Sequence, residues 1–111
     1  MKWFVCKNFQ WKTSNAMTID RGWGNGYVAV SPSHPLWGVD YNSVEIEVHG
    51  GLTYSAFNDS FKHNDIPKNY WVFGFDTSHY NDSLKRWPKE AVEAETKRLF
   101  CQLMEIEIGE L

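Results

Sequence analysis

The chain has 111 residues, of which 42% are hydrophobic and 16% aromatic, so we expect one folded domain over residues 1–111 and exclude a disordered chain. Its formal net charge is −3 and its 11 basic residues are scattered, which disfavours general nucleic-acid binding because that depends on a basic surface. No apolar run approaches the roughly 20 residues of a membrane-spanning helix, so we expect no membrane partner.

The two cysteines carry little functional information. Cys6 and Cys101 fit neither a C-x-x-C motif nor a zinc-ligand spacing. Lys2 and Lys7 interrupt the first apolar residues too early for the core of a secretory signal. We therefore expect an intracellular protein with two reduced thiols, and a disulfide between the two cysteines is the alternative.

Two strands are expected near the N-terminus. Residues 1–7 have a β-rich composition whose side chains alternate between two faces, which indicates a buried first strand. Residues 8–25 show no sustained period, so we expect mainly loop, with a short strand around 16–19 as an option. Residues 26–30 form a compact strand candidate that ends at Pro32, because proline cannot donate to a sheet ladder.

The clearest alternation in the chain lies at residues 44–48, where β-branched and acidic side chains alternate and predict a strand with one wet face. The double glycine that follows suits a two-residue hairpin turn, which predicts a paired strand over 52–57. That register places Thr53 and Ser55 on the apolar face of Val48. Either a bulge shifts the register, or these hydroxyls line a polar pocket.

The C-terminal half predicts one more strand and a helix. The aromatic run at 70–75 indicates a central strand, preceded by an exposed loop over 58–69. Residues 88–105 predict a helix, because Pro88 suits a first turn and an apolar stripe follows at helical spacing: Val92, Thr96, Leu99, Leu103 and Ile106. We therefore expect an α+β fold, with four or five mainly antiparallel strands packed with one C-terminal helix.

Polar residues gather beside glycines and at predicted strand ends, which indicates a ligand pocket. Asp76 and His79 have D-x-x-H spacing after a strand, so the carboxylate can orient the imidazole. A turn histidine or a turn-capping aspartate is the ordinary structural alternative. The candidate ligand-binding residues are His34, Asp40, His49, Gly50, Gly51, Thr53, Ser55, Asp76 and His79.

Several recognised chemistries lack their motifs. No H-E-x-x-H, cysteine cluster or paired carboxylate is present, so we expect neither a metal site nor a cofactor. Convergence of dispersed residues on zinc or iron is the alternative, and the candidates are His34, His49, Asp76 and His79. No nucleophile elbow surrounds Ser55, and no Walker-type phosphate loop occurs. A metal-independent phosphodiesterase is chemically permissible, with His49 and His79 as acid and base and Asp76 in support.

Four sequence motifs occur in order over residues 26–82, namely residues 26–30, 34–41, 48–55 and 73–76 with His79. In these motifs the chain resembles a family of small proteins encoded mostly by phages and prophages. Ser33 and Asn81 depart from it, since such proteins typically have glycine before His-Pro-Leu and often before Asp82. The resemblance implies a phage accessory protein in the cytoplasm of an infected bacterial host, where such proteins often counter host defence.

Three functional hypotheses follow. In the first, the protein binds a small nucleotide-like or phosphorylated ligand without turning it over, and thereby sequesters a bacterial defence signal. In the second, the phosphodiesterase cleaves a cyclic nucleotide signal. In the third, the protein inhibits a host defence protein by binding it through its acidic, aromatic surface. An aromatic-rich surface on so small a chain is also compatible with a homo-oligomer.

Overall fold

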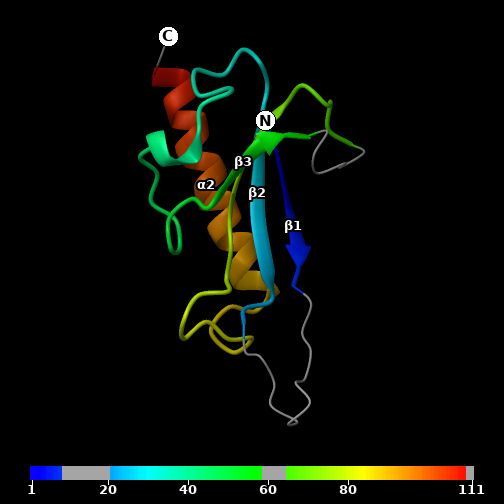
Figure 1. The fold of residues 1–111 in the computed structure, drawn as a ribbon, viewed down its shortest axis with the longest axis vertical. Helices are drawn as coiled ribbons and strands as arrows, with labels where there is room; N and C mark the ends of the chain where they lie inside the picture. Colours follow the sequence, from blue (N-terminus) through cyan, green and yellow to red (C-terminus); the bar gives the residue numbers. More distant parts are fainter. Residues whose placement is uncertain (9–20, 59–64, 110–111) are drawn as a thin grey trace.

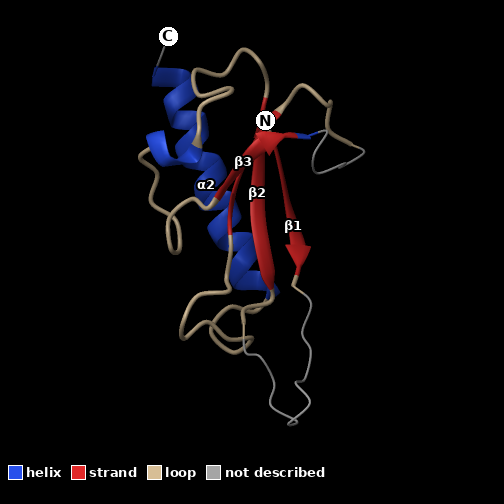
Figure 2. Cartoon of the chain, viewed as in Figure 1, coloured by secondary structure: helices blue, strands red, loops and turns tan. Residues whose placement is uncertain are grey.

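The computed structural model describes residues 1–8, 21–58 and 65–109, so the optional strand around 16–19 lies outside the described residues. Four antiparallel strands form one sheet, and a long C-terminal helix packs on one of its faces (Figures 1 and 2). The order across the sheet is β1 (Lys2–Lys7), β2 (Gly24–Val30), β4 (Trp71–Phe75) and β3 (Tyr54–Phe57). The predicted α+β fold is confirmed.

β2 and β4 lie in the middle of the sheet, and their side chains alternate between two apolar layers. Val28 and Phe73 face the helix, whereas Ala29 and Val72 face the opposite side, where Ile66 covers them. Each buried valine, isoleucine or phenylalanine side chain among these contributes about 1.5–3 kcal/mol relative to an exposed one. The predicted burial of the first strand is wrong, because β1 is an edge strand with Phe4 as its one buried residue.

The helix α2 (Lys89–Gly109) begins directly after Pro88 and ends four residues later than predicted. Its buried residues are Val92, Thr96, Leu99 and Leu103, which confirms the apolar stripe except for the half-buried Ile106. The helix packs tightly on the sheet at Gly26, where an added Cβ would overlap the Thr96 hydroxyl and the Phe75 ring. Among the described residues, no helix has the length and apolar character needed to span a bilayer.

The strand predicted at 44–48 is wrong, although its inward and outward alternation is right. Val48 is buried and Glu45 and Glu47 are exposed, but the segment forms no ladder with any described strand. Its partner is the side chain of Gln102 in α2, whose Oε1 accepts from the Glu47 N–H at 3.0 Å and whose Nε2 donates to the Glu47 carbonyl at 2.9 Å. The side-chain amide of Gln102 therefore pairs with this segment, in place of the neighbouring strand that the sequence predicted.

The predicted hairpin between residues 44–48 and 52–57 is wrong, because residues 44–48 form no strand, but its turn forms and its second strand is present as β3. The Gly51 N–H donates to the Val48 carbonyl at 2.8 Å, and Gly50 and Gly51 have φ angles of 71° and 78°. The chain then leaves residues 44–48 and pairs with β4, beginning with a bond from the Thr53 N–H to the Gly74 carbonyl at 2.9 Å. A short 3-10 helix, η1 (Tyr41–Ser43), lies in the preceding connection.

Candidate functional site

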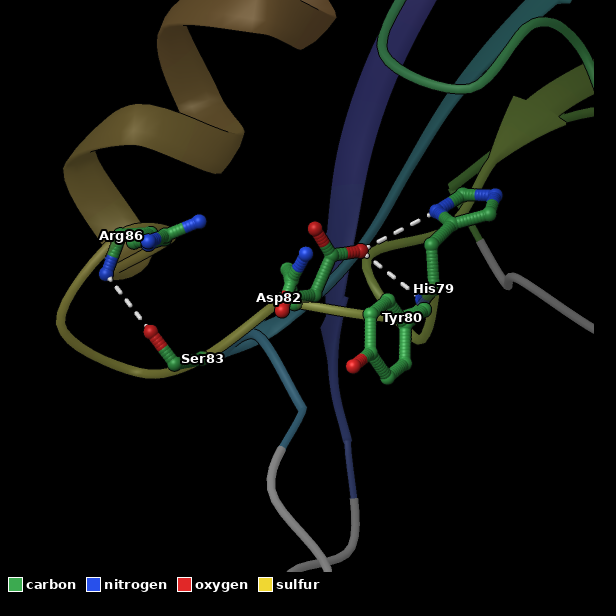
Figure 3. Close-up of a pocket in the computed structure, with 6 residues that line it drawn as sticks. His79, Tyr80, Asp82, Ser83 and Arg86 are labelled. Atoms are coloured by element: carbon green, nitrogen blue, oxygen red, sulfur yellow. Dashed lines mark hydrogen bonds and ion pairs between the residues drawn. The ribbon is translucent and has the colours of Figure 1, made fainter.

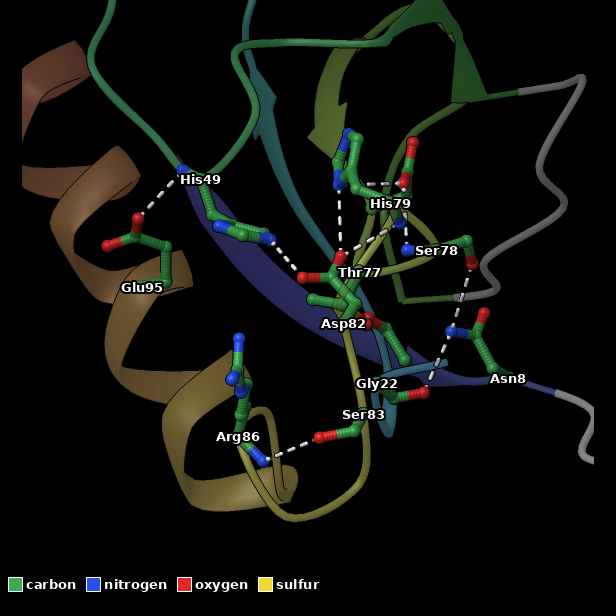
Figure 4. A network of polar contacts seen from close by, with 12 residues as sticks. Asn8, Gly22, His49, Thr77, Ser78, His79, Asp82, Ser83, Arg86 and Glu95 are labelled. Atoms are coloured by element: carbon green, nitrogen blue, oxygen red, sulfur yellow. Dashed lines mark hydrogen bonds and ion pairs between the residues drawn. The ribbon is translucent and has the colours of Figure 1, made fainter. Parts of the chain in front are cut away.

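The loop between β4 and α2 meets the double-glycine turn at one end of the sheet (Figure 4). Thr77 anchors this loop, since its buried hydroxyl donates to the Gly24 carbonyl at 2.6 Å and its own carbonyl accepts from the Gly22 N–H at 2.6 Å. Asn81 has a φ of 74°, a left-handed conformation that asparagine tolerates better than most residues. This turn brings the Asp82 carboxylate back to His79.

Asp82 joins two histidines from separate parts of the chain, and we call His49, His79 and Asp82 the His–Asp cluster. The Asp82 carboxylate is 6% exposed and accepts from His49 Nε2 at 2.8 Å, His79 Nδ1 at 3.0 Å and the His79 backbone N–H at 2.9 Å. An ionised carboxylate only accepts hydrogen bonds, so both ring nitrogens carry protons. The other nitrogen of each ring is therefore the one that can face a ligand when the imidazole is neutral.

The ionisation of Asp82 follows from the same contacts. Burial of the carboxyl by itself raises its pKa. Hydrogen bonds from the His79 backbone N–H and from both imidazoles lower it by more, so the pKa of Asp82 lies below the ordinary aspartate value. The cluster therefore keeps a carboxylate charge in a nearly buried position near neutral pH.

Both imidazoles are held in place by further packing. The His49 ring lies 4.2 Å from the Trp87 ring and 5.1 Å from the His79 ring, centroid to centroid. The His49 backbone N–H donates to Glu95 Oε2 at 2.8 Å, which ties the turn to α2. Gly50 packs so close to the His79 ring that a Cβ there would overlap it. The cluster is thus preorganised by contacts that do not involve a ligand.

An open concavity of about 440 Å³ lies beside the cluster (Figure 3). It is lined by His79, Tyr80, Asn81, Asp82, Ser83 and Arg86. Ser83 Oγ accepts from the Arg86 backbone N–H at 3.1 Å, which leaves the hydroxyl proton as a donor. The Arg86 side chain is exposed, and no carboxylate among residues 1–8, 21–58 and 65–109 pairs with its guanidinium.

The fold brings four of the predicted site residues together: His49, Gly50, Asp76 and His79. His49 and His79 belong to the cluster, and Gly50 contacts it. Asp76 lies at its border, since Asp76 Oδ1 is 3.5 Å from His79 Nδ1 and also accepts from the Ser78 N–H at 3.0 Å. The carboxylate of the D-x-x-H motif therefore does lie near the imidazole. The closer carboxylate is that of Asp82, which follows His79 in the sequence.

The remaining predicted residues make structural contacts elsewhere. His34 is buried, with Nε2 donating to the Leu103 carbonyl at 2.8 Å and Nδ1 accepting from the Leu36 N–H at 3.0 Å. Ser55 Oγ accepts from the Tyr41 N–H at 3.1 Å. The other three lie in turns or loops outside the cluster. Asp40 caps η1, Gly51 has open space around its α-carbon, and Thr53 is exposed.

Asp82 is the central residue that the sequence reasoning missed, together with Ser83, Arg86 and Trp87. A signal was present, because H-x-x-D from His79 to Asp82 repeats the D-x-x-H spacing before it. Comparisons with protein-family models, curated proteins and solved structures gave no match. The chemistry of the site therefore has to be inferred from its geometry.

Proposed function

We propose that this protein binds a small phosphorylated or nucleotide-like ligand in the concavity beside the His–Asp cluster. The observation that carries the proposal is Arg86, an exposed residue that lines the concavity and whose guanidinium has no carboxylate partner among the described residues. Guanidinium groups suit phosphate oxygens because they offer several N–H donors in a planar fork. An unneutralised arginine beside a concavity supports an anionic ligand.

Neighbouring groups complement such a ligand. The Ser83 hydroxyl can donate to a phosphate oxygen, and the Tyr80 ring, which is 94% exposed, offers a face on which a base can stack. The volume of about 440 Å³ lies within the range of about 300–1,000 Å³ usual for small-molecule sites. The Asp82 charge is nearly buried and opposed by hydrogen-bond donors, so it repels an anion less than an exposed carboxylate does.

The finer proposal is that the ligand is a bacterial defence signal, sequestered by a phage accessory protein. The support for this step is the resemblance to small phage and prophage proteins, together with a concavity that suits a phosphorylated compound. Sequestration requires that the ligand remain intact. It also requires affinity in the micromolar range or tighter, so that a modest amount of protein lowers the free concentration of the signal.

Hydrolysis is the second candidate function. The observation that favours it is that one carboxylate orients both imidazoles, whose ring centroids are 5.1 Å apart. His49 and His79 would then serve as acid and base on a phosphodiester, with no metal ion. Chromatography after long incubation with cyclic nucleotides separates the two functions, since sequestration returns intact ligand and hydrolysis returns product.

Isothermal titration against mononucleotides, cyclic nucleotides and dinucleotides tests the proposal. We expect micromolar binding of at least one phosphorylated compound, weakened about tenfold or more by Arg86→Ala because a charged hydrogen bond is lost. Lys68→Ala removes an exposed positive charge outside the concavity and is the matched control. Folded protein that binds no member of the panel, or equal weakening in both variants, overturns the proposal.

A further inference from the structure

We infer that the His–Asp cluster binds a divalent transition-metal ion of the Zn²⁺ class. This inference goes beyond the proposed phosphorylated ligand and does not depend on it. One ligand atom each from His49, His79 and Asp82 lies within 4.8 Å of the others. The three residues come from the double-glycine turn and from the loop after β4, so folding assembles a ligand set that has no metal motif in the sequence.

The interatomic distances are close to those between ligands of one ion. Zn²⁺ bonds nitrogen and oxygen ligands at about 2.0–2.2 Å in tetrahedral geometry, so neighbouring ligands of one ion lie about 3.3–3.6 Å apart. His49 Nε2 lies 2.8 Å from Asp82 Oδ1, His79 Nδ1 lies 3.0 Å from Asp82 Oδ2, and one ligand atom from each residue lies within 4.8 Å of the others. On ion binding these two hydrogen bonds are replaced by bonds to the metal, and the side chains adjust to the ligand spacing.

The donor set selects the class of ion. Two imidazole nitrogens and one carboxylate suit Zn²⁺ and neighbouring transition metals, whereas Mg²⁺ and Ca²⁺ prefer oxygen ligands alone. Three protein ligands also leave at least one coordination position for water or an anion. His79 and Asp82 line the concavity, so a water or anion could reach that position from it, and Asp76 is near enough to His79 to supply a further oxygen.

The contacts around the cluster suit a metal site. The backbone of His49 is tied to Glu95, the ring of His49 packs on Trp87, and Gly50 leaves room for the His79 ring. Such support orients ligands before the ion arrives. On binding, the proton on His49 Nε2 and that on His79 Nδ1 leave these atoms, either to the other ring nitrogen or to solvent. Nitrogens bound to an ion cannot also act as acid and base, so Zn²⁺ binding would exclude the metal-independent hydrolytic mechanism.

Titration of the metal-free chain with Zn²⁺, in the absence of any nucleotide, tests the inference. We expect one ion per chain, with affinity reduced about tenfold or more in Asp82→Asn and in His49→Ala. Asp65→Asn is the control, because that exposed aspartate lies outside the cluster. Co²⁺ serves as a spectroscopic substitute, and its visible absorption should report nitrogen and oxygen ligands in the wild-type chain and should require higher Co²⁺ concentrations in the two cluster variants.

Circular dichroism shows whether each variant is folded. If both variants unfold, nuclear magnetic resonance of the wild-type imidazoles decides, because Zn²⁺ must shift the ring resonances of His49 and His79 and leave those of the buried His34 in place. The inference is overturned if wild-type protein binds no Zn²⁺ at micromolar concentration, if folded variants bind as tightly as wild type, or if the shifted imidazoles are others. Binding of Zn²⁺ without nucleotide binding, or the reverse, separates this inference from the proposed function.

Discussion

Gly50 packs against the imidazole ring of His79, and no side chain fits between them. The neighbouring Gly51 has a similar positive φ but open space around its α-carbon. The two glycines therefore have different roles in the same turn. Both provide the left-handed backbone, whereas Gly50 alone also makes room for a member of the His–Asp cluster.

Gly50→Ala and Gly51→Ala separate these roles. Each should lower the free energy of unfolding by about 1–2 kcal/mol, because alanine is strained at positive φ. Gly50→Ala should cost more and should also displace the His79 ring, since its Cβ overlaps that ring. Urea unfolding measures the stability, and the imidazole chemical shifts of His79 report the displacement. Equal losses in both variants, with unchanged His79 shifts, would contradict a steric role for Gly50.

His34 should be a structural residue and not a ligand-binding one. His34→Ala removes the bond from its ring to the Leu103 carbonyl and leaves the Leu36 N–H without its His34 acceptor, so we expect a loss of about 2–3 kcal/mol in unfolding free energy. Ser33→Ala, on the exposed neighbour, should change it by no more than about 0.5 kcal/mol. Under conditions where His34→Ala remains folded, Zn²⁺ and nucleotide titrations should match wild type. A selective loss of binding in the folded variant would return His34 to the site.

Gln102→Ala should release the segment at residues 44–48 from α2. The variant removes two hydrogen bonds to the Glu47 backbone, which are worth about 0.5–1.5 kcal/mol each. Hydrogen exchange of the Glu47 amide should become faster, while amides in β2 and β4 change little. Glu105→Ala, on the exposed surface of the same helix, provides the control. Unchanged exchange at Glu47 would show that packing of the apolar side chains alone holds the segment.

The two thiols should differ in reactivity. Burial raises the pKa of the Cys6 thiol, which lowers its thiolate fraction at a given pH, and Cys101 is exposed on α2. At about pH 7, iodoacetamide should therefore label Cys101 before Cys6, and labelling of Cys6 should accelerate as the pH rises toward its higher pKa. Peptide mass spectrometry over time measures both rates. Faster labelling of Cys6 at neutral pH would contradict this order.

Local patterns predicted the elements well but not all of their partners. Helical spacing of Val92, Thr96, Leu99 and Leu103 identified the stripe, because those contacts follow from the geometry of one element. Alternation at residues 44–48 gave the correct inward face, yet alternation is equally consistent with a strand and with a segment bound to a helix. The partner, Gln102, lies 55 positions away from Glu47 in sequence, and no local pattern reveals it.

The residues of the candidate site were also predicted only where a local sequence pattern was sufficient. His49, Asp76 and His79 were predicted because imidazoles and a carboxylate beside glycines and a strand end have an evident chemical use. Asp82 was missed because its role depends on the left-handed turn at Asn81 and on the approach of the double-glycine turn. Asparagine before aspartate is compatible with such a turn, but also with an ordinary exposed loop.

The contact between Gln102 and residue 47 has a consequence for sequence variation. The amide of Gln102 bonds to backbone atoms alone, so it does not discriminate among side chains at position 47. Substitution of the exposed Glu45 or Glu47 should therefore leave this contact intact, whereas substitution of Gln102 should remove it. Position 102 in the helix should therefore be conserved, whereas the side chains of the segment that it binds should vary.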